Sequence, residues 1–134
     1  MQLRPDGGVY VIAEAGVNHN GSLDMAFRLA DAARDAGADA VKYQAFTADL
    51  LVSKRAPKAA YQSAALGEEI SQRDMLKALE FSPADFLRIR DYCDGIGVHF
   101  LCSAFDARSL DFLVNELGQT RIKFGSGDLT DAPL

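Results

Sequence analysis

The sequence predicts an α/β protein built on a parallel sheet, because two hydrophobic patterns alternate along its 134 residues. Short, almost continuously apolar runs are typical of parallel strands that are buried on both faces. Between them lie amphipathic stretches, with apolar residues three and four positions apart as in helices. The resulting order is β-α-β-α-β-α-β, and we expect one domain over residues 1–134.

Four segments carry the strand pattern and are rich in β-branched or aromatic residues. They are Val9–Gly16, Ala40–Phe46, Val98–Phe105 and Arg121–Gly125. The second strand is followed by a long excursion, Thr47–Phe81. It contains a short amphipathic helix near Ser71–Glu80 and a basic stretch made of Lys54, Arg55 and Lys58. Excursions of this length in compact α/β domains are commonly functional.

Three helices are expected, and a glycine ends each of them. They run from about Ser22 to Gly37, from Ser82 to Gly95, and from Asp106 to Leu117 with Gly118 as the ending glycine. In the second, Pro83 suits the first turn and Asp85 can complete a variant of the capping box. The apolar stripes of the three helices should face the core. They are Leu23, Ala26, Phe27, Ala30 and Ala33; Phe86, Ile89 and Cys93; and Leu110, Leu113, Val114 and Leu117.

Two architectures fit four β-α units: an open doubly wound sheet, or half of a barrel that needs about 250 residues to close. The glycine fingerprint of dinucleotide-binding folds is missing after the first strand, where Gly16–Gly21 reads Gly-Val-Asn-His-Asn-Gly. This absence disfavours the open sheet.

Composition excludes several classes of protein. The net charge of −5 argues against a nucleic-acid partner, which needs basic surface. No apolar run approaches the roughly 20 residues of a membrane span, and the N-terminus lacks a signal-peptide pattern, so we expect a cytoplasmic protein. Cys93 and Cys102 have no metal-binding spacing and are expected to be buried, reduced thiols.

Charged residues interrupt the otherwise apolar strands. Glu14 lies near the end of the first strand, Lys42 and Gln44 share one face of the second, and Lys123 lies in the fourth. Buried lysines need a partner. An anion held between Lys42 and Lys123 would satisfy both, and an ion pair between Lys42 and Glu14 on adjacent strands is the alternative.

Further candidates follow the strands. Gly125-Ser126-Gly127-Asp128 could bring backbone amides and the Ser126 hydroxyl to a phosphate, and Ser103 could offer another hydroxyl. His19, with Asn18 beside it, follows the first strand, where it is equally consistent with a site residue and a structural one. His99, at the start of the third strand, is expected to be structural, and the two histidines should lie too far apart to share a metal.

Four motifs, in order and spacing, resemble the N-acetylneuraminate (sialic acid) synthase family. They are Ile-Ala-Glu-Ala-Gly-Val-Asn-His-Asn-Gly (12–21), Gly-Ala-Asp-Ala-Val-Lys-Tyr-Gln (37–44), Phe-Leu-Cys-Ser-Ala-Phe-Asp (100–106) and Ile-Lys-Phe-Gly-Ser-Gly-Asp-Leu-Thr-Asp-Ala-Pro-Leu (122–134). The resemblance implies a (β/α)₈ TIM barrel, of which this chain holds about the first four β-α units. It also implies condensation of phosphoenolpyruvate with N-acetylmannosamine, or a related acylamino sugar, to a nonulosonic acid and phosphate.

The resemblance also implies roles for individual residues. Phosphoenolpyruvate would be held by Lys42, Ser103, Lys123 and Ser126. Glu14 would handle the sugar or the attacking water, and Gln44 and Asp128 would lie near the sugar and the reacting centre. Many members have threonine at position 103 and glutamate at 128. A divalent metal, manganese or magnesium, is implied for the full-length enzyme, with histidine ligands outside this chain.

Alternatives remain open. The acceptor sugar could be that of a legionaminic or pseudaminic acid synthase, or of a spore-coat polysaccharide enzyme. The chain could also be a noncatalytic half-barrel that only binds anions. A half-barrel exposes two sheet edges, so we expect association with another copy or with the missing half, and little or no activity of the chain alone.

Overall fold

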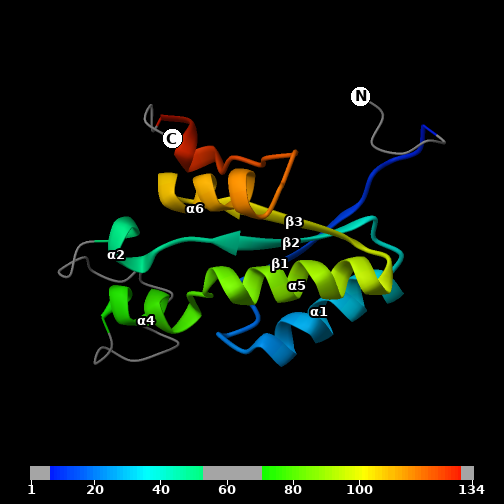
Figure 1. Ribbon diagram of the computed structural model, residues 1–134, viewed down its shortest axis with the longest axis horizontal. Coiled ribbons are helices and arrows are strands. Elements are labelled where there is room, and N and C mark those ends of the chain that lie inside the picture. The colour runs from blue at the N-terminus through cyan, green and yellow to red at the C-terminus, as the bar shows by residue number, and fades with distance from the viewer. Residues whose placement is uncertain (1–6, 53–70, 131–134) are drawn as a thin grey trace. The chain divides into compact units, whose positions relative to one another are not determined.

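A computed structural model describes residues 7–52 and 71–130 of the chain (Figure 1). The basic stretch Lys54, Arg55 and Lys58 falls outside the described residues. The chain forms two compact units, residues 1–44 with 82–102 and residues 45–81 with 103–134. No helix among the described residues is long and apolar enough to cross a membrane.

A three-stranded sheet of order β1-β2-β3 contains the first three predicted strands, each with shorter bounds. These are β1 (Ile12–Gly16), β2 (Ala40–Ala45) and β3 (His99–Ala104). β1 and β2 run parallel. The His99 amide donates to the Asp39 carbonyl before β2, and the Phe105 amide donates to the Ala45 carbonyl at its end, so β3 runs parallel to β2 as well.

Two helices of the first unit, α1 (Leu23–Asp35) and α5 (Pro83–Ile96), run beside each other in Figure 1. The first helix was predicted to start near Ser22, and Ser22 caps α1 by accepting a hydrogen bond from the Met25 amide at 3.3 Å. The predicted capping box of α5 is also confirmed: Ser82 accepts from the Asp85 amide, and the Asp85 carboxylate accepts from the Ser82 amide.

The core of this unit is formed by the small side chains of α1 and the larger ones of α5. The fully or almost fully buried members are Ala26, Ala30, Ala33, Phe86, Ile89 and Cys93. The prediction that α5 stops at Gly95 is wrong by two residues. Gly97, not Gly95, adopts the left-handed conformation, with φ +79°, in which its amide bonds back to the last carbonyls of the helix.

The second unit contains α2 (Ala48–Leu51), α4 (Gln72–Leu79) and α6 (Ala107–Asp111). A 3₁₀-helix over Ser126–Thr130 closes the described chain. The predicted short helix near Ser71–Glu80 is confirmed as α4, with Ser71 as its cap.

The helix predicted over Asp106–Leu117 changes type halfway. Beyond α6 the chain continues as a π-helix, Phe112–Glu116, in which each amide bonds to a carbonyl five residues back. The wider turn shifts part of the buried face: Leu113 and Leu117 of the predicted stripe are buried. Val114 was predicted to face the core but is 43% exposed, whereas Phe112, outside the predicted stripe, is buried.

The predicted fourth strand is wrong for this structure, because Arg121–Gly125 has no regular secondary structure. Lys123 and Phe124 are exposed. A strand persists through ladders to its neighbours. In a (β/α)₈ barrel a fourth strand has a neighbour on each side, and residues 7–52 and 71–130 contain no strand besides β1, β2 and β3.

Candidate functional site

Glu14 of β1 and Lys42 of β2 are direct neighbours in the parallel register and form an ion pair. Of the two partners predicted for Lys42, the structure therefore shows the carboxylate on the adjacent strand. The Lys42 side chain is only 13% exposed, whereas that of Glu14 is 49% exposed. The pair thus joins a largely buried ammonium group to a carboxylate that solvent or a ligand can reach.

The two faces of β2 differ as the alternation predicts. Val41 and Tyr43 are fully buried, and the Tyr43 hydroxyl donates to the Ala26 carbonyl of α1 at 2.8 Å. Burial raises the pKa of Tyr43 above its usual value, so the hydroxyl keeps the proton it donates. Lys42 and Gln44 are partly exposed on the opposite face, which is turned away from α1.

Gly16 leaves room for the polar groups of this face. A β-carbon on Gly16 would lie 3.3 Å from Glu14 Oε1 and 3.4 Å from Gln44 Nε2, and the residue has φ +55°. A carboxylate and a carboxamide therefore lie beside a backbone position without a side chain, and the Lys42 ammonium pairs with that carboxylate. Together they can offer charged and neutral hydrogen-bonding groups to a polar anionic ligand.

The loop after β1 holds His19 inside the protein. Its ring is 1% exposed, and Nδ1 accepts from the Gly21 amide at 3.1 Å, which leaves the ring proton on Nε2. Burial lowers the pKa of His19 to about 4, so the ring is neutral near pH 7. These contacts give His19 a role in the loop's own structure, while Asn18 beside it is exposed. Contact of either residue with a substrate stays a prediction.

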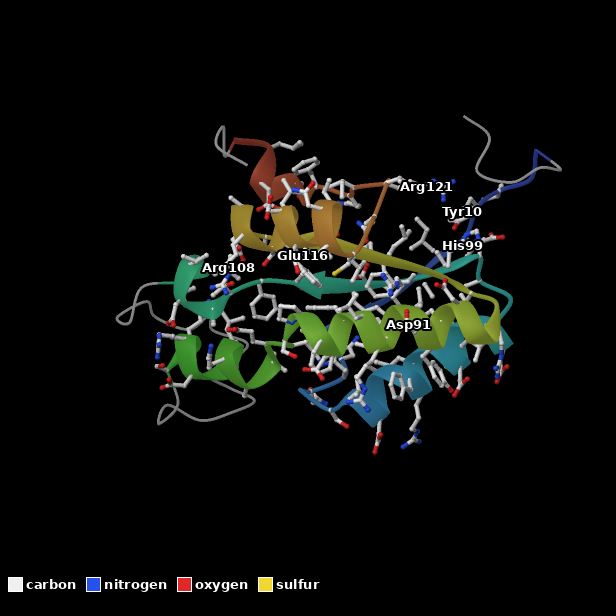
Figure 2. All side chains as sticks on the ribbon, viewed as in Figure 1. Tyr10, Asp91, His99, Arg108, Glu116 and Arg121 are labelled. Atoms are coloured by element: carbon white, nitrogen blue, oxygen red, sulfur yellow. The ribbon has the colours of Figure 1, made fainter. Side chains whose placement is uncertain are left out.

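His99 lies at the start of β3 and stacks on Tyr10, with ring centroids 5.8 Å apart (Figure 2). The Tyr10 hydroxyl is hydrogen-bonded to His99 Nδ1. This pairing with a neighbouring aromatic ring supports the structural role expected for His99.

In the second unit the candidates differ in exposure. Ser103 is buried, whereas Lys123 and Ser126 are exposed. The Lys123 ammonium donates to the Phe124 carbonyl at 2.6 Å. Because Lys42 and Lys123 belong to different units, the shared anion cavity stays a prediction.

The Gly125 amide, a predicted phosphate donor, donates to Asp128 Oδ2 at 3.1 Å. A β-carbon on Gly125 would lie 2.6 Å from that same oxygen and 3.6 Å from the Phe105 ring. The glycine therefore allows the close approach of a negatively charged oxygen to its own amide. In this structure that oxygen belongs to the chain itself.

Metal binding finds no support within the described part of the chain, where no three His, Cys, Asp or Glu side chains come together to hold an ion. The residues present there do not fit the implied divalent metal. The metal stays a prediction for residues beyond this chain.

The two cysteines are free and buried, as predicted. Burial raises the pKa of Cys93 to about 12 and raises that of Cys102 as well. Neither thiol is therefore suited to nucleophilic chemistry.

Asp106 is a residue whose contacts the sequence pattern did not reveal. The pattern predicts it only as the start of a helix, and it does cap α6. It is also 9% exposed and accepts a hydrogen bond from the Thr47 amide at 2.7 Å. Its position directly after a predicted buried strand is the sequence signal that could have predicted this contact.

Comparison with known proteins gives consistent matches. Residues 29–134 match the model of the NeuB family. Over 134 residues, the chain is 47% identical to an N,N'-diacetyllegionaminic acid synthase of Legionella pneumophila, covering 98% of this chain and 37% of the relative.

Two solved structures are similar. An N-acetylneuraminic acid (sialic acid) synthetase of Leptospira borgpetersenii, in complex with citrate, matches with a TM-score of 0.72 and 31% identity over 92% of this chain and 38% of that one. The spore coat polysaccharide biosynthesis protein spsE of Bacillus subtilis matches with a TM-score of 0.61 and 38% identity over 96% and 32%. The α/β fold is thus that of a partial TIM barrel of this kind, and the chain spans about a third of its relatives' length.

Proposed function

Because the chain belongs to the NeuB family, we propose that it contributes the first β-α units of a synthase that condenses phosphoenolpyruvate with an acylamino sugar. The observation that carries the proposal is the polar group of Glu14, Lys42 and Gln44 on the strand face turned away from α1. In a β/α barrel this face is the interior, and catalytic residues come from strand ends there.

Lys42 supplies the positive charge for an anionic substrate. An ammonium has three donors, and the contact with Glu14 uses one of them. A phosphate or carboxylate group of phosphoenolpyruvate can therefore bind beside Glu14, and Lys42 then orients the substrate without transferring a proton. The Leptospira relative was solved with citrate, another carboxylate-bearing anion.

Glu14 is suited to the step in which water is added. In the proposed reaction, the electron pair of the enol double bond joins C3 of phosphoenolpyruvate to the aldehyde carbon of the sugar. The carbonyl π bond breaks, the aldehyde oxygen takes up a proton and becomes a hydroxyl, and positive charge develops at C2. Water adds to C2, and phosphate leaves by cleavage of the C–O bond. The half-exposed Glu14 carboxylate can accept the water proton, while the ammonium beside it keeps the carboxylate oriented.

The family also implies substrate roles for Ser103, Lys123, Ser126 and Asp128, which belong to the second unit. The two hydroxyls and the ammonium would bind phosphoenolpyruvate, and Asp128 would lie near the reacting centre. Gln44 would meet the sugar. An alternative role as a noncatalytic anion-binding module has no specific observation in its favour.

The 47% identity to the legionaminic acid enzyme supports a proposal for the acceptor sugar. Phosphoenolpyruvate contains no nitrogen, so both N-acetyl groups of N,N'-diacetyllegionaminic acid must come from the sugar. We therefore place a diacetamido sugar ahead of N-acetylmannosamine as the acceptor. Both share the acylamino group that defines the substrate class.

The test is turnover in a chimera in which this chain replaces the matching segment of the Legionella synthase. Phosphate release is measured with phosphoenolpyruvate and each sugar, with and without manganese, and circular dichroism checks folding. We expect release that requires both substrates and is abolished by Lys42→Met. A folded chimera that releases no phosphate with either sugar, beside an active parent enzyme, contradicts the proposal. The 134-residue chain alone should show little or no turnover.

A further inference from the structure

Two successive backbone amides at the start of the excursion are each held by a carboxylate from another segment. The Thr47 amide donates to Asp106 Oδ2 at 2.7 Å, and the Ala48 amide donates to Glu80 Oε2 at 3.0 Å. Thr47 is the N-cap residue of α2 but makes no side-chain cap bond of its own. Asp106 and Glu80 therefore accept from the N-cap amide and the first helical amide of α2, two donors that have no acceptor within the helix.

Asp106 connects the ends of two neighbouring strands. It follows β3 by two residues, as Thr47 follows β2, and the Phe105 amide donates to the Ala45 carbonyl at 3.0 Å. The same carboxylate accepts from the Ser109 amide and hydroxyl, both at 2.8 Å. With three donors around it, the 9% exposed Asp106 has one defined orientation, and it fixes the direction in which the chain leaves β2.

Glu80 closes the other end of the excursion. It follows α4 directly, and its side chain is held by the Lys77 ammonium at 3.0 and 3.1 Å. Arg73 of α4 also pairs with Asp49 of α2. Figure 1 shows α2 and α4 close together. The entry and the exit of the excursion are thus joined to each other through Glu80, and to the end of β3 through Asp106.

We propose that Asp106 and Glu80 are positioning residues that hold the α2–α4 pair at the carboxyl ends of β2 and β3 so that it contributes to recognition of the acceptor sugar. The proposal rests on the proposed function, because in a barrel enzyme the loops at these strand ends form the substrate site. The α2–α4 pair directly follows β2, which carries Lys42 and Gln44. Loss of the hydrogen bonds at Thr47 and Ala48 would shift the α2–α4 pair away from the substrate. Such a change would not remove any side chain that itself touches the substrate.

The first measurement tests the two hydrogen bonds in the 134-residue chain itself. Amide hydrogen exchange is followed by nuclear magnetic resonance. Asp106 uses both oxygens, and Asn keeps only one, which as the N-cap of α6 stays with the Ser109 amide and leaves an NH2 group, which cannot accept, towards Thr47. Asp106→Asn should therefore accelerate exchange at Thr47 on the order of tenfold or more and leave Ala48 nearly unchanged, and Glu80→Ala should do the reverse. Glu80→Gln keeps a carbonyl oxygen that can accept, so it should protect Ala48. Unchanged exchange in Asp106→Asn and Glu80→Ala overturns the proposal.

The second measurement tests positioning by kinetics in the chimera described above. Asp106→Asn and Glu80→Ala should each raise the KM for the acylamino sugar on the order of tenfold, with the KM for phosphoenolpyruvate changed by less than about twofold. Glu80→Gln should restore a nearly normal sugar KM. Asp111→Asn is the control, because Asp111 lies on the exposed side of α6, where it accepts from Asn115.

The outcomes separate the two proposals. An unmutated chimera without turnover refutes the proposed function and, with it, the role in sugar recognition, while the amide exchange still reports on the two hydrogen bonds. An active chimera in which Asp106→Asn lowers kcat and leaves the sugar KM unchanged shows a purely structural role and overturns the positioning proposal. An equal rise in both KM values overturns it as well.

Discussion

The carboxylate of Glu14 and the ammonium of Lys42 face each other across β1 and β2, and they differ in their access to water. Lys42 is 13% exposed and Glu14 is 49% exposed. A buried charge loses more hydration than an exposed one, so the two partners do not depend on each other equally. Loss of Glu14 should therefore destabilise the folded chain more than loss of Lys42 does.

This asymmetry predicts unequal effects of removing either partner. Glu14→Ala leaves a mostly buried ammonium without its carboxylate and should lower the free energy of unfolding by about 2 kcal/mol. Lys42→Met replaces the ammonium with an apolar group, leaves a hydrated carboxylate, and should cost less than about 1 kcal/mol. Urea unfolding of the chain measures both. Arg34→Ala is the control, since its pairs with Asp31 and Asp35 are exposed and should contribute little to stability. Equal losses for the two variants would contradict the unequal burial.

The buried His19 predicts a stability that depends on pH. Its folded-state pKa of about 4 lies below the ordinary value of 6.5, so between these values the unfolded chain binds more protons than the folded one. The free energy of unfolding should therefore be highest above about pH 6.5 and should fall as the pH falls towards 4. The total decrease due to His19 is at most about 3 kcal/mol. Urea unfolding between pH 4 and 7 should show this slope.

His19→Gln provides the control for that experiment, because it removes the imidazole and keeps a side chain that can accept from the Gly21 amide. The variant should lose most of the slope between pH 4 and 6.5, since His99 and the carboxylates are the same in both proteins. Parallel pH profiles for the two proteins would refute a buried, neutral His19.

The two cysteines predict slow thiol chemistry in the folded chain. With a pKa of about 12, only about one in ten thousand Cys93 side chains is a thiolate at pH 8. Cys102 is buried too, and its pKa is also raised. Labelling with a disulfide reagent at pH 8 should therefore be slow for both thiols in buffer and fast in urea. Rapid labelling of one thiol per folded chain would show that a cysteine is accessible.

Periodicity predicted the parts of the fold whose residues carry the pattern themselves. The stripe Ala26, Ala30 and Ala33 defines α1, and Ser82 with Asp85 marks the start of α5 by local chemistry. The π-helix at Phe112–Glu116 could not be predicted in this way, because a change from four-residue to five-residue hydrogen bonding leaves no distinct apolar spacing over one turn.

The failure at Arg121–Gly125 has a different cause. A strand depends on its neighbours, so an apolar run shows only that a strand is possible. The partner of Lys42 was also undetermined by sequence, since a carboxylate on the next strand and a bound anion satisfy the same ammonium. The faces of β2 were predictable, because alternation alone separates Lys42 and Gln44 from Tyr43.

Gly125 and Gly127 form a matched pair for testing the role of the Gly-Ser-Gly-Asp segment. A β-carbon on Gly125 would lie 2.6 Å from Asp128 Oδ2, so Gly125→Ala must displace that carboxylate from the Gly125 amide. Because Asp128 is only partly buried, the loss of stability should be about 1 kcal/mol. If Asp128 acts near the reacting centre, phosphate release by the chimera should fall by about tenfold or more. Gly127→Ala meets nothing within 4 Å and should leave both quantities nearly unchanged. Equal turnover in the two variants would show that the Asp128 carboxylate, held beside the Gly125 amide, takes no part in the reaction.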